Sequence, residues 1–245
     1  MKLFRFPQDQ AELDGILSRA ELASLMIPFV TEDQVKEACD QAVKYGLAGV
    51  LAIPDICQQT VKHLQGTGVA PVAMVAAMEV DDNDRTTRLN LVKELIKLGV
   101  RDMDCGVPAS TVLNGEFQEI AAEIREKADT LHAAGGKLGV VLEIDQWTQP
   151  QLFDLCQAAV DGGADYLRIS SGMEQIGAAN IGRATINNVA TLYERYGGHI
   201  KIKAGGGWDF AWLEDVNEYL ESGAALADIG PVTIDQLERL GYRRN

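Results

Sequence analysis

Residues 138–169 read LGVVLEIDQWTQPQLFDLCQAAVDGGADYLRI, and they contain one complete structural unit. An apolar run at 138–143 is followed by a helical pattern at 154–160 and by a second apolar run at 166–169. Short apolar runs of this length are typical of buried strands. A helix between two such runs is typical of a crossover that joins parallel strands. The segment therefore predicts a strand–helix–strand unit with parallel pairing.

The same alternation extends along the chain in both directions. Strands are expected at residues 22–29, 48–53, 71–78, 102–106, 138–143, 166–169, 200–204 and 226–230. Helical patterns lie between them: Thr31 is expected to cap a first helix, and residues 117–131 carry an apolar stripe at 3.6-residue spacing. Strands that alternate with helices in this way indicate consecutive βα units.

The number of units and the length of the chain favour a closed barrel. The chain has 245 residues, close to the roughly 250 that are typical of a (β/α)₈ barrel. We predict an α/β protein with a single TIM-barrel domain over residues 1–245, of which about the first 20 form an extension or short helix. An open doubly wound sheet is the alternative. The chain has neither GxGxxG after the first strand nor GxxxxGK[ST], the motifs of nucleotide-binding folds.

The charge of the chain excludes several classes of partner. Its formal net charge is -14 and its isoelectric point is about 4.6. Such an acidic protein repels nucleic acid and anionic membrane surfaces, so neither is an expected partner. No apolar run is long enough for a signal or a membrane span. The four cysteines include no CxxC pair, which predicts reduced thiols and a cytoplasmic protein.

Charged residues lie near the ends of four of the apolar runs. They are Asp104, Glu143, Arg168 and Lys203. Catalytic groups in barrel enzymes lie at the C-terminal ends of the strands, so these four are the candidate catalytic residues. The structural alternative is a salt-bridge layer that closes the barrel, with the two carboxylates paired to the two cations.

Glycine-rich turns follow the candidate residues and predict an anion site. The candidate binding residues are Ser170, Ser171 and Gly172 after Arg168, Gly205, Gly206 and Gly207 after Lys203, and Gly230 at the end of the eighth strand. Glycine lets backbone N–H groups approach an anion, and a following helix adds its positive end. A substrate phosphate or carboxylate is expected to bind here.

No metal or other cofactor is expected. The three histidines, His63, His132 and His199, fall on helices or at the start of a strand, away from the candidate site. A zinc site would need several such ligands together. The acidic run 79–84 is interpreted as a solvated loop, and Trp147 and Trp208 are expected on loops near the barrel opening.

Several segments together resemble the deoxyribose-phosphate aldolase family. They are VTEDQVKEACDQAVKYGLAGVLAIP (30–54), RDMDCGV (101–107), LGVVLEID (138–145), GGADYLRISSGM (162–173) and IKIKAGGG (200–207). The resemblance runs in order from about residue 31 to residue 230. It implies a (β/α)₈ barrel and class I aldolase chemistry, in which a lysine forms an imine with a carbonyl substrate without a metal.

The sequence departs from the family pattern at residues that carry out catalysis or bind phosphate in that family. The imine-forming lysine of the family's sixth strand matches Arg168, and a guanidinium remains protonated at physiological pH. The family's second lysine matches Lys203, and its catalytic aspartate matches Asp104. A D-H-T-like pattern on strand one is replaced by residues 22–24, so an active-site aspartate is expected to be missing there. A Gly-Thr-Ser-like turn is replaced by residues 230–232, in which proline offers no N–H.

Two functions are consistent with this pattern. The first is an aldolase-type lyase for a small sugar-like or sugar-phosphate carbonyl compound, in which Lys203 attacks, Arg168 lowers the lysine's pKa, and Asp104 moves protons. Asp104 and Glu143 would act in the opposite direction on that pKa. The second is a barrel without aldol activity that binds a sugar-like metabolite or catalyses a reaction without an imine. The assembly stays open, although acidic barrels of this kind often form homodimers.

Overall fold

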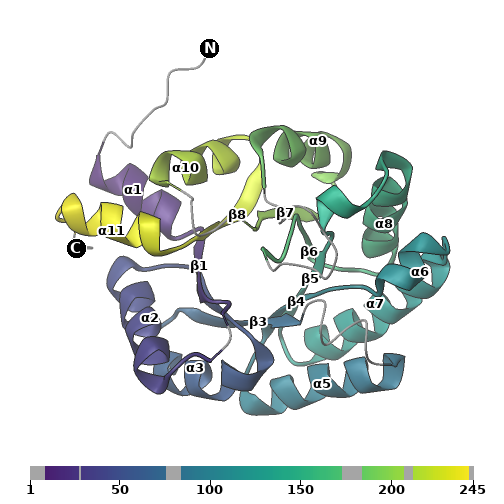
Figure 1. Cartoon of the computed structure of the whole chain (residues 1–245), viewed down its shortest axis with the longest axis horizontal. Helices are drawn as coiled ribbons and strands as arrows, with labels where there is room; N and C mark the ends of the chain where they lie inside the picture. Colours follow the sequence, from purple (N-terminus) through teal and green to yellow (C-terminus); the bar gives the residue numbers. More distant parts are fainter. Residues whose placement is uncertain (1–8, 28, 76–83, 173–183, 207–211, 243–245) are drawn as a thin grey trace.

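A computed structural model describes residues 9–27, 29–75, 84–172, 184–206 and 212–242. Its centre is a closed barrel of eight parallel strands in sequence order, seen end-on in Figure 1. The strands are β1 (Ala20–Leu25), β2 (Gly49–Ala52), β3 (Ala70–Val75), β4 (Asp102–Cys105), β5 (Lys137–Val141), β6 (Tyr166–Arg168), β7 (Lys201–Ala204) and β8 (Ala224–Ile229). The prediction of a (β/α)₈ barrel is confirmed, and the open sheet is excluded.

Helices surround the barrel. They are α1 (Gln10–Leu17), α2 (Glu32–Tyr45), α3 (Cys57–Leu64), α5 (Arg85–Leu98), α6 (Ala109–Leu113), α7 (Phe117–Ala133), α8 (Gln149–Asp161), α9 (Ile186–Tyr196), α10 (Leu213–Glu221) and α11 (Pro231–Arg239). Short 3₁₀ turns follow β2 (Pro54–Ile56) and β5 (Ile144–Gln146). No helix among the described residues is long and apolar enough to cross a membrane.

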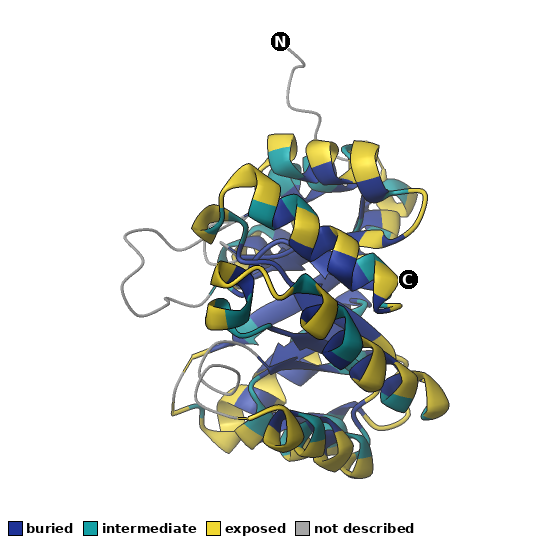
Figure 2. Ribbon diagram, turned by 90° about the vertical axis from the view of Figure 1, so that its right-hand side faces the viewer, coloured by how far each residue is buried: buried dark blue, intermediate teal, exposed yellow. Residues whose placement is uncertain are grey.

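Local sequence signals set the helix ends and faces. Thr31 caps α2 in a capping box with Gln34, and Gly46 ends that helix in the left-handed conformation. Along α7 the predicted stripe is buried at Ile120 and Leu131. Figure 2 shows the consequence: the helices bury the faces that pack on the barrel and expose the outer ones.

The first strand begins earlier than the sequence predicts. β1 starts at Ala20 and ends at Leu25, whereas residues 22–29 were expected. The reason is its pairing with β8, where Ala20 lies opposite Ala227 and the Ala227 N–H donates to the carbonyl of Arg19. This shift places Glu21 inside the strand, which matters for the site.

The interior of the barrel is divided between apolar and charged residues. One apolar cluster fills the part next to β1, β2, β3 and β5, and comprises Ala23, Met26, Leu51, Val72, Met74 and Val141. A larger apolar core lies between the strands and the helices. Buried charged residues also lie on β1, β4, β6, β7 and β8: Glu21, Asp104, Arg168, Lys203 and Asp228.

Candidate active site

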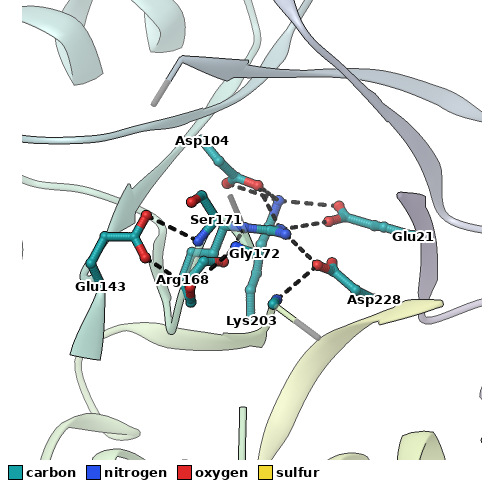
Figure 3. Close-up of polar contacts among 10 residues, drawn as sticks. Glu21, Asp104, Glu143, Arg168, Ser171, Gly172, Lys203 and Asp228 are labelled. Atoms are coloured by element: carbon teal, nitrogen blue, oxygen red, sulfur yellow. Dashed lines mark hydrogen bonds and ion pairs between the residues drawn. The ribbon is translucent and has the colours of Figure 1, made fainter. Parts of the chain in front are cut away.

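Five charged side chains from five strands meet inside the barrel (Figure 3). They are Glu21 on β1, Asp104 on β4, Arg168 on β6, Lys203 on β7 and Asp228 on β8, and they are called the ionic cluster below. Strand register brings them to one level: Glu21 lies opposite Asp228, and Arg168 lies opposite Lys203. None of the five is more than 3% exposed, so their charges are stabilised by one another rather than by water.

Arg168 is held by every carboxylate of the ionic cluster. Its Nη1 lies 3.1 Å from Asp104 Oδ2 and 3.6 Å from Glu21 Oε2, and its Nη2 donates to Asp228 Oδ2. Its Nε donates to the Ser170 carbonyl at 3.0 Å. Burial lowers the pKa of Arg168, but the carboxylates of Asp228 and Asp104 raise that pKa further, to above its ordinary value. Arg168 is therefore a permanent cation in this site.

Lys203 lies between two carboxylates. Its Nζ is 3.1 Å from Glu21 Oε1 and 3.1 Å from Asp104 Oδ1, and it stands 4.8 Å from the centre of the Tyr166 ring. Burial lowers the pKa of Lys203, but Asp104 and Glu21 raise it more strongly, and the net pKa lies above its ordinary value. Arg168 lowers this pKa, as the sequence predicts, but the carboxylates outweigh it.

The ionic cluster contains one more acid than base. Three carboxylates face two cations, which leaves a net charge of -1 when all five groups are ionised. Burial, together with the neighbouring Asp104 and Asp228, raises the pKa of Glu21 to about 7, although Lys203 acts to lower it. Burial also raises the pKa of Asp228. Glu21 is thus the group that takes up a proton near neutral pH.

The raised pKa of Glu21 predicts a pH-dependent stability. Its pKa is 4.5 unperturbed and about 7 in the fold, so the folded protein holds an extra proton between those pH values. The free energy of unfolding should therefore fall as pH rises from 4.5 to 7, by roughly 3 kcal/mol in total, and change no further from this group above pH 7. Urea titrations over this range should show that Glu21→Gln removes this part of the slope. An unchanged slope in the variant would assign the proton to another group.

Two glycines, Gly139 and Gly205, leave room for the side chains of Asp104 and Arg168 because they have no Cβ. A Cβ added at Gly139, opposite Asp104, would lie 2.0 Å from Asp104 Oδ1. A Cβ added at Gly205 would lie 2.7 Å from Arg168 Cζ. The sequence predicts an anion-binding role for Gly205, and the structure shows that this glycine is also needed for the guanidinium to fit.

Glu143 binds the serine-containing turn rather than the cations. Its Oε2 accepts a hydrogen bond from the Ser170 hydroxyl at 2.7 Å, and its Oε1 accepts one from the Ser171 N–H at 3.3 Å. The Gly172 N–H donates to the Ser170 Oγ at 3.1 Å. Glu143 has a left-handed backbone (φ 46°), which is costly outside glycine and indicates a position fixed by its surroundings. The carboxylates that pair with Arg168 and Lys203 are Glu21, Asp104 and Asp228.

The second glycine turn also binds a carboxylate of the chain. The Gly206 N–H donates to Asp228 Oδ2 at 3.2 Å. Gly230 is the residue before α11, which begins at Pro231. Gly207, Trp208 and residues 79–83 of the acidic run lie outside the described residues. Within the predicted cradle, the Gly206 and Ser171 N–H groups each donate to a carboxylate of the protein, and the Gly205 N–H donates to the Lys203 carbonyl.

The sequence interpretation missed two members of the ionic cluster. Residues 22–24 were expected to lack the family's active-site aspartate, and Glu21, one position earlier, supplies a carboxylate from strand one. Asp228 comes from the otherwise apolar run ALADI on β8. In both cases an acid inside a buried strand was the available signal. The alternation of side chains along a strand would have placed Glu21 with Ala23 on the inner face.

The histidines lie apart from the cluster. His63 is on α3, His132 is near the end of α7, and His199 precedes β7. Over residues 9–27, 29–75, 84–172, 184–206 and 212–242, no group of three or more His, Cys, Asp or Glu side chains is arranged to hold a metal ion.

Comparisons with known proteins give the same relationship for sequence and fold. No protein-family model matches the chain. It is 26% identical over 196 residues to the deoxyribose-phosphate aldolase of Caldicellulosiruptor saccharolyticus, covering 80% of this chain and 85% of that protein. It is 28% identical over 201 residues to the deoxyribose-phosphate aldolase of Crocosphaera subtropica, covering 82% and 85%. The chain is therefore similar to deoxyribose-phosphate aldolases over about four fifths of its length.

The fold agrees with that of solved deoxyribose-phosphate aldolases. The tetrameric deoxyribose-phosphate aldolase from Aeropyrum pernix superposes with a TM-score of 0.77 at 18% identity, over 95% of this chain and 93% of that one. Another solved aldolase, QR15, superposes with a TM-score of 0.76 at 17% identity, over 94% and 98%. These likenesses establish the shared barrel. Activity has to be argued from the site.

Proposed function

We propose that this protein is an aldolase-type carbon–carbon lyase that acts through an imine at Lys203 on a small sugar-like carbonyl compound. The observation that carries the proposal is the position of Lys203 Nζ, 3.1 Å from each of two buried carboxylates inside a barrel related to deoxyribose-phosphate aldolases. An amine next to groups that can accept and return protons is the arrangement that imine chemistry requires.

The first step is removal of a proton from Lys203. The raised pKa of Lys203 keeps it an ammonium at neutral pH, and an ammonium has no lone pair with which to attack a carbonyl. Glu21 is hydrogen-bonded to this ammonium and has a pKa of about 7, so it can take the proton when a substrate displaces the ion pair. The neutral amine then attacks the carbonyl carbon and forms a carbinolamine.

The next steps use Asp104 as the group that moves protons. As the carbinolamine forms, Glu21 returns its proton to the alkoxide oxygen, and Asp104 takes the proton that the attacking nitrogen loses. Asp104 then delivers that proton through a water to the carbinolamine hydroxyl, which leaves as water and gives the iminium. As a base it then accepts the proton of the substrate's β-hydroxyl while the bond between the α and β carbons breaks. The products are an aldehyde and an enamine on Lys203. Protonation of the enamine and hydrolysis release the second product and restore the amine.

Arg168 supports this chemistry without forming bonds to the substrate. A guanidinium is too weakly acidic to become a nucleophile. Its contact with Asp104 fixes one of the two carboxylates that bind Lys203, and its contact with Asp228 compensates the charge of a third carboxylate. The role we propose for Arg168 is therefore positioning and electrostatic balance, with Glu143 holding the adjacent serine turn.

The proposal is tested by reductive trapping on the intact protein. The protein is incubated with acetaldehyde, pyruvate or 2-deoxyribose and then treated with sodium borohydride, which reduces an imine to a stable amine. One added carbonyl compound per chain in the intact mass is expected from at least one of them. Unchanged mass with all three, under conditions where a known class I aldolase is modified, would contradict the proposal.

A second function is favoured by the complete pairing of the cations. Arg168 and Lys203 both have carboxylate partners, and the raised pKa of Lys203 opposes nucleophilic attack. These features suit a barrel in which the ionic cluster is structural and the protein binds a sugar-like metabolite, or catalyses a reaction without an imine. Binding of a sugar without trapping would favour this function.

The cellular setting follows from composition and from the relatives. The four cysteines are free and buried, which suits the reducing cytoplasm that we propose for this protein. The related aldolase from Aeropyrum pernix is tetrameric. We propose self-association for this chain as well, with a homodimer as its simplest form, to be measured by analytical ultracentrifugation.

A further inference from the structure

Asp228 occupies the place that the glycine turn offers to an anion. Its Oδ2 accepts hydrogen bonds from the Gly206 N–H at 3.2 Å and from Arg168 Nη2. Backbone N–H groups in glycine turns and guanidinium groups are common donors to phosphate and carboxylate groups in the anion-binding sites of proteins. Here a side chain of the protein already accepts from both.

Glu143 does the same at the serine turn. It accepts from the Ser170 hydroxyl at 2.7 Å and from the Ser171 N–H at 3.3 Å, and it is 8% exposed. The two turns predicted to bind an anionic substrate are therefore both engaged by carboxylates of the chain. A phosphate entering at either turn would have to displace a buried carboxylate.

The charge balance also disfavours an anionic substrate. The ionic cluster contains three carboxylates and two cations, and Glu143 adds a fourth carboxylate beside it. These six groups carry a net charge of -2 when all are ionised, and of -1 when Glu21 is protonated. A phosphate dianion would add like charge to a buried site that is already negative.

The site instead has acceptors that need donors. Asp228 Oδ1 and Glu21 Oε2 are buried and have no hydrogen-bond donor among the residues that the structure describes, although Glu21 Oε2 is 3.6 Å from Arg168 Nη1. A buried acceptor without a donor is costly, and a ligand that donates hydrogen bonds removes that cost. Hydroxyl groups are uncharged donors of this kind.

We infer that the site selects an uncharged, hydroxyl-rich carbonyl compound and excludes its phosphorylated counterpart, with Asp228 and Glu143 as the residues that determine this specificity. The carbonyl part of the inference rests on the proposed function. The preference for hydroxyl groups over phosphate rests on the contacts and charges of the carboxylates in the site and on no catalytic step, so it can be tested without catalysis.

The test is calorimetric binding of linear polyols and their terminal phosphates to the full chain. Glycerol, erythritol, ribitol and sorbitol form the series, each compared with its monophosphate; none has a carbonyl, so no imine is involved. We expect at least one polyol to bind at least tenfold more tightly than its phosphate. Asp228→Ala should free the Gly206 N–H and Arg168 Nη2 and shift that ratio at least tenfold toward the phosphate.

Two further variants keep the test decisive. Glu143→Gln removes one charge without emptying space and should reduce the discrimination severalfold, which provides a second measurement if Asp228→Ala does not fold. Asp40→Asn makes the same change in net charge at an exposed site on α2 and should leave the ratio unchanged.

The inference is overturned if no polyol binds, if a phosphate binds as tightly as its polyol, or if the folded variants leave the ratio unchanged. If borohydride trapping fails but polyols bind more tightly than their phosphates, only the proposed function is contradicted. If trapping succeeds but polyols show no such preference, only the inferred specificity is contradicted.

Discussion

Replacement of Lys203 by arginine is expected to lower aldol cleavage by at least about a thousandfold and to abolish reductive trapping. Arginine keeps the positive charge between Glu21 and Asp104, so the net charge of the ionic cluster does not change, but it has no amine that can form an imine. Loss of covalent catalysis of this size corresponds to about 4 kcal/mol of transition-state stabilisation. The measurement is kcat/KM on whichever carbonyl compound the native protein cleaves.

A matched control is available two residues away on the same strand. Lys201 begins β7 and is exposed, whereas Lys203 is buried in the ionic cluster. Lys201→Arg should leave both cleavage and trapping within about twofold of the native protein, since surface substitutions have small effects. Native-like turnover in Lys203→Arg, or its loss in Lys201→Arg, would move the nucleophile away from Lys203.

Replacement of Arg168 by methionine is expected to destabilise the fold by about 3–5 kcal/mol. The guanidinium contacts Glu21, Asp104 and Asp228, and its removal leaves three buried carboxylates with a single cation. Methionine fills part of the space, so the effect measured is that of the uncompensated charge rather than of an empty cavity. Urea denaturation at pH 8, where the carboxylates are ionised, gives the difference in unfolding free energy.

The control for this prediction is an arginine on the surface. Arg239 pairs with Asp235 on α11, and its side chain is 77% exposed. Arg239→Met should change the unfolding free energy by less than about 1 kcal/mol. If Arg168→Met changed the unfolding free energy as little as Arg239→Met does, the stability of the fold would not depend on the arginine of the ionic cluster.

The barrel was predictable because its signals are local and repeated. The apolar runs, the Thr31 cap and the stripe on 117–131 each indicate one element, and their alternation indicates parallel βα units. The start of β1 was not predictable in the same way. Its first residues are fixed by pairing with β8, which comes from the other end of the sequence.

A charge near the end of an apolar run predicted that Asp104, Arg168 and Lys203 lie close together, and the structure brings them together. The same rule selected Glu143, which contacts the serine turn instead. Glu21 and Asp228 lie within strands, and their importance depends on which side chains face them across the barrel. The direction of the Lys203 pKa shift depends on how close Asp104 and Glu21 lie to its ammonium, and the sequence does not give those distances.

The central claim is that the imine forms on Lys203, and peptide mapping of the borohydride-reduced protein tests it most directly. After trapping with the carbonyl compound that gives a mass shift, proteolysis and tandem mass spectrometry should place the added mass on Lys203 and on no other lysine. An adduct on Lys201 or on any other lysine, with Lys203 unmodified, would contradict the account.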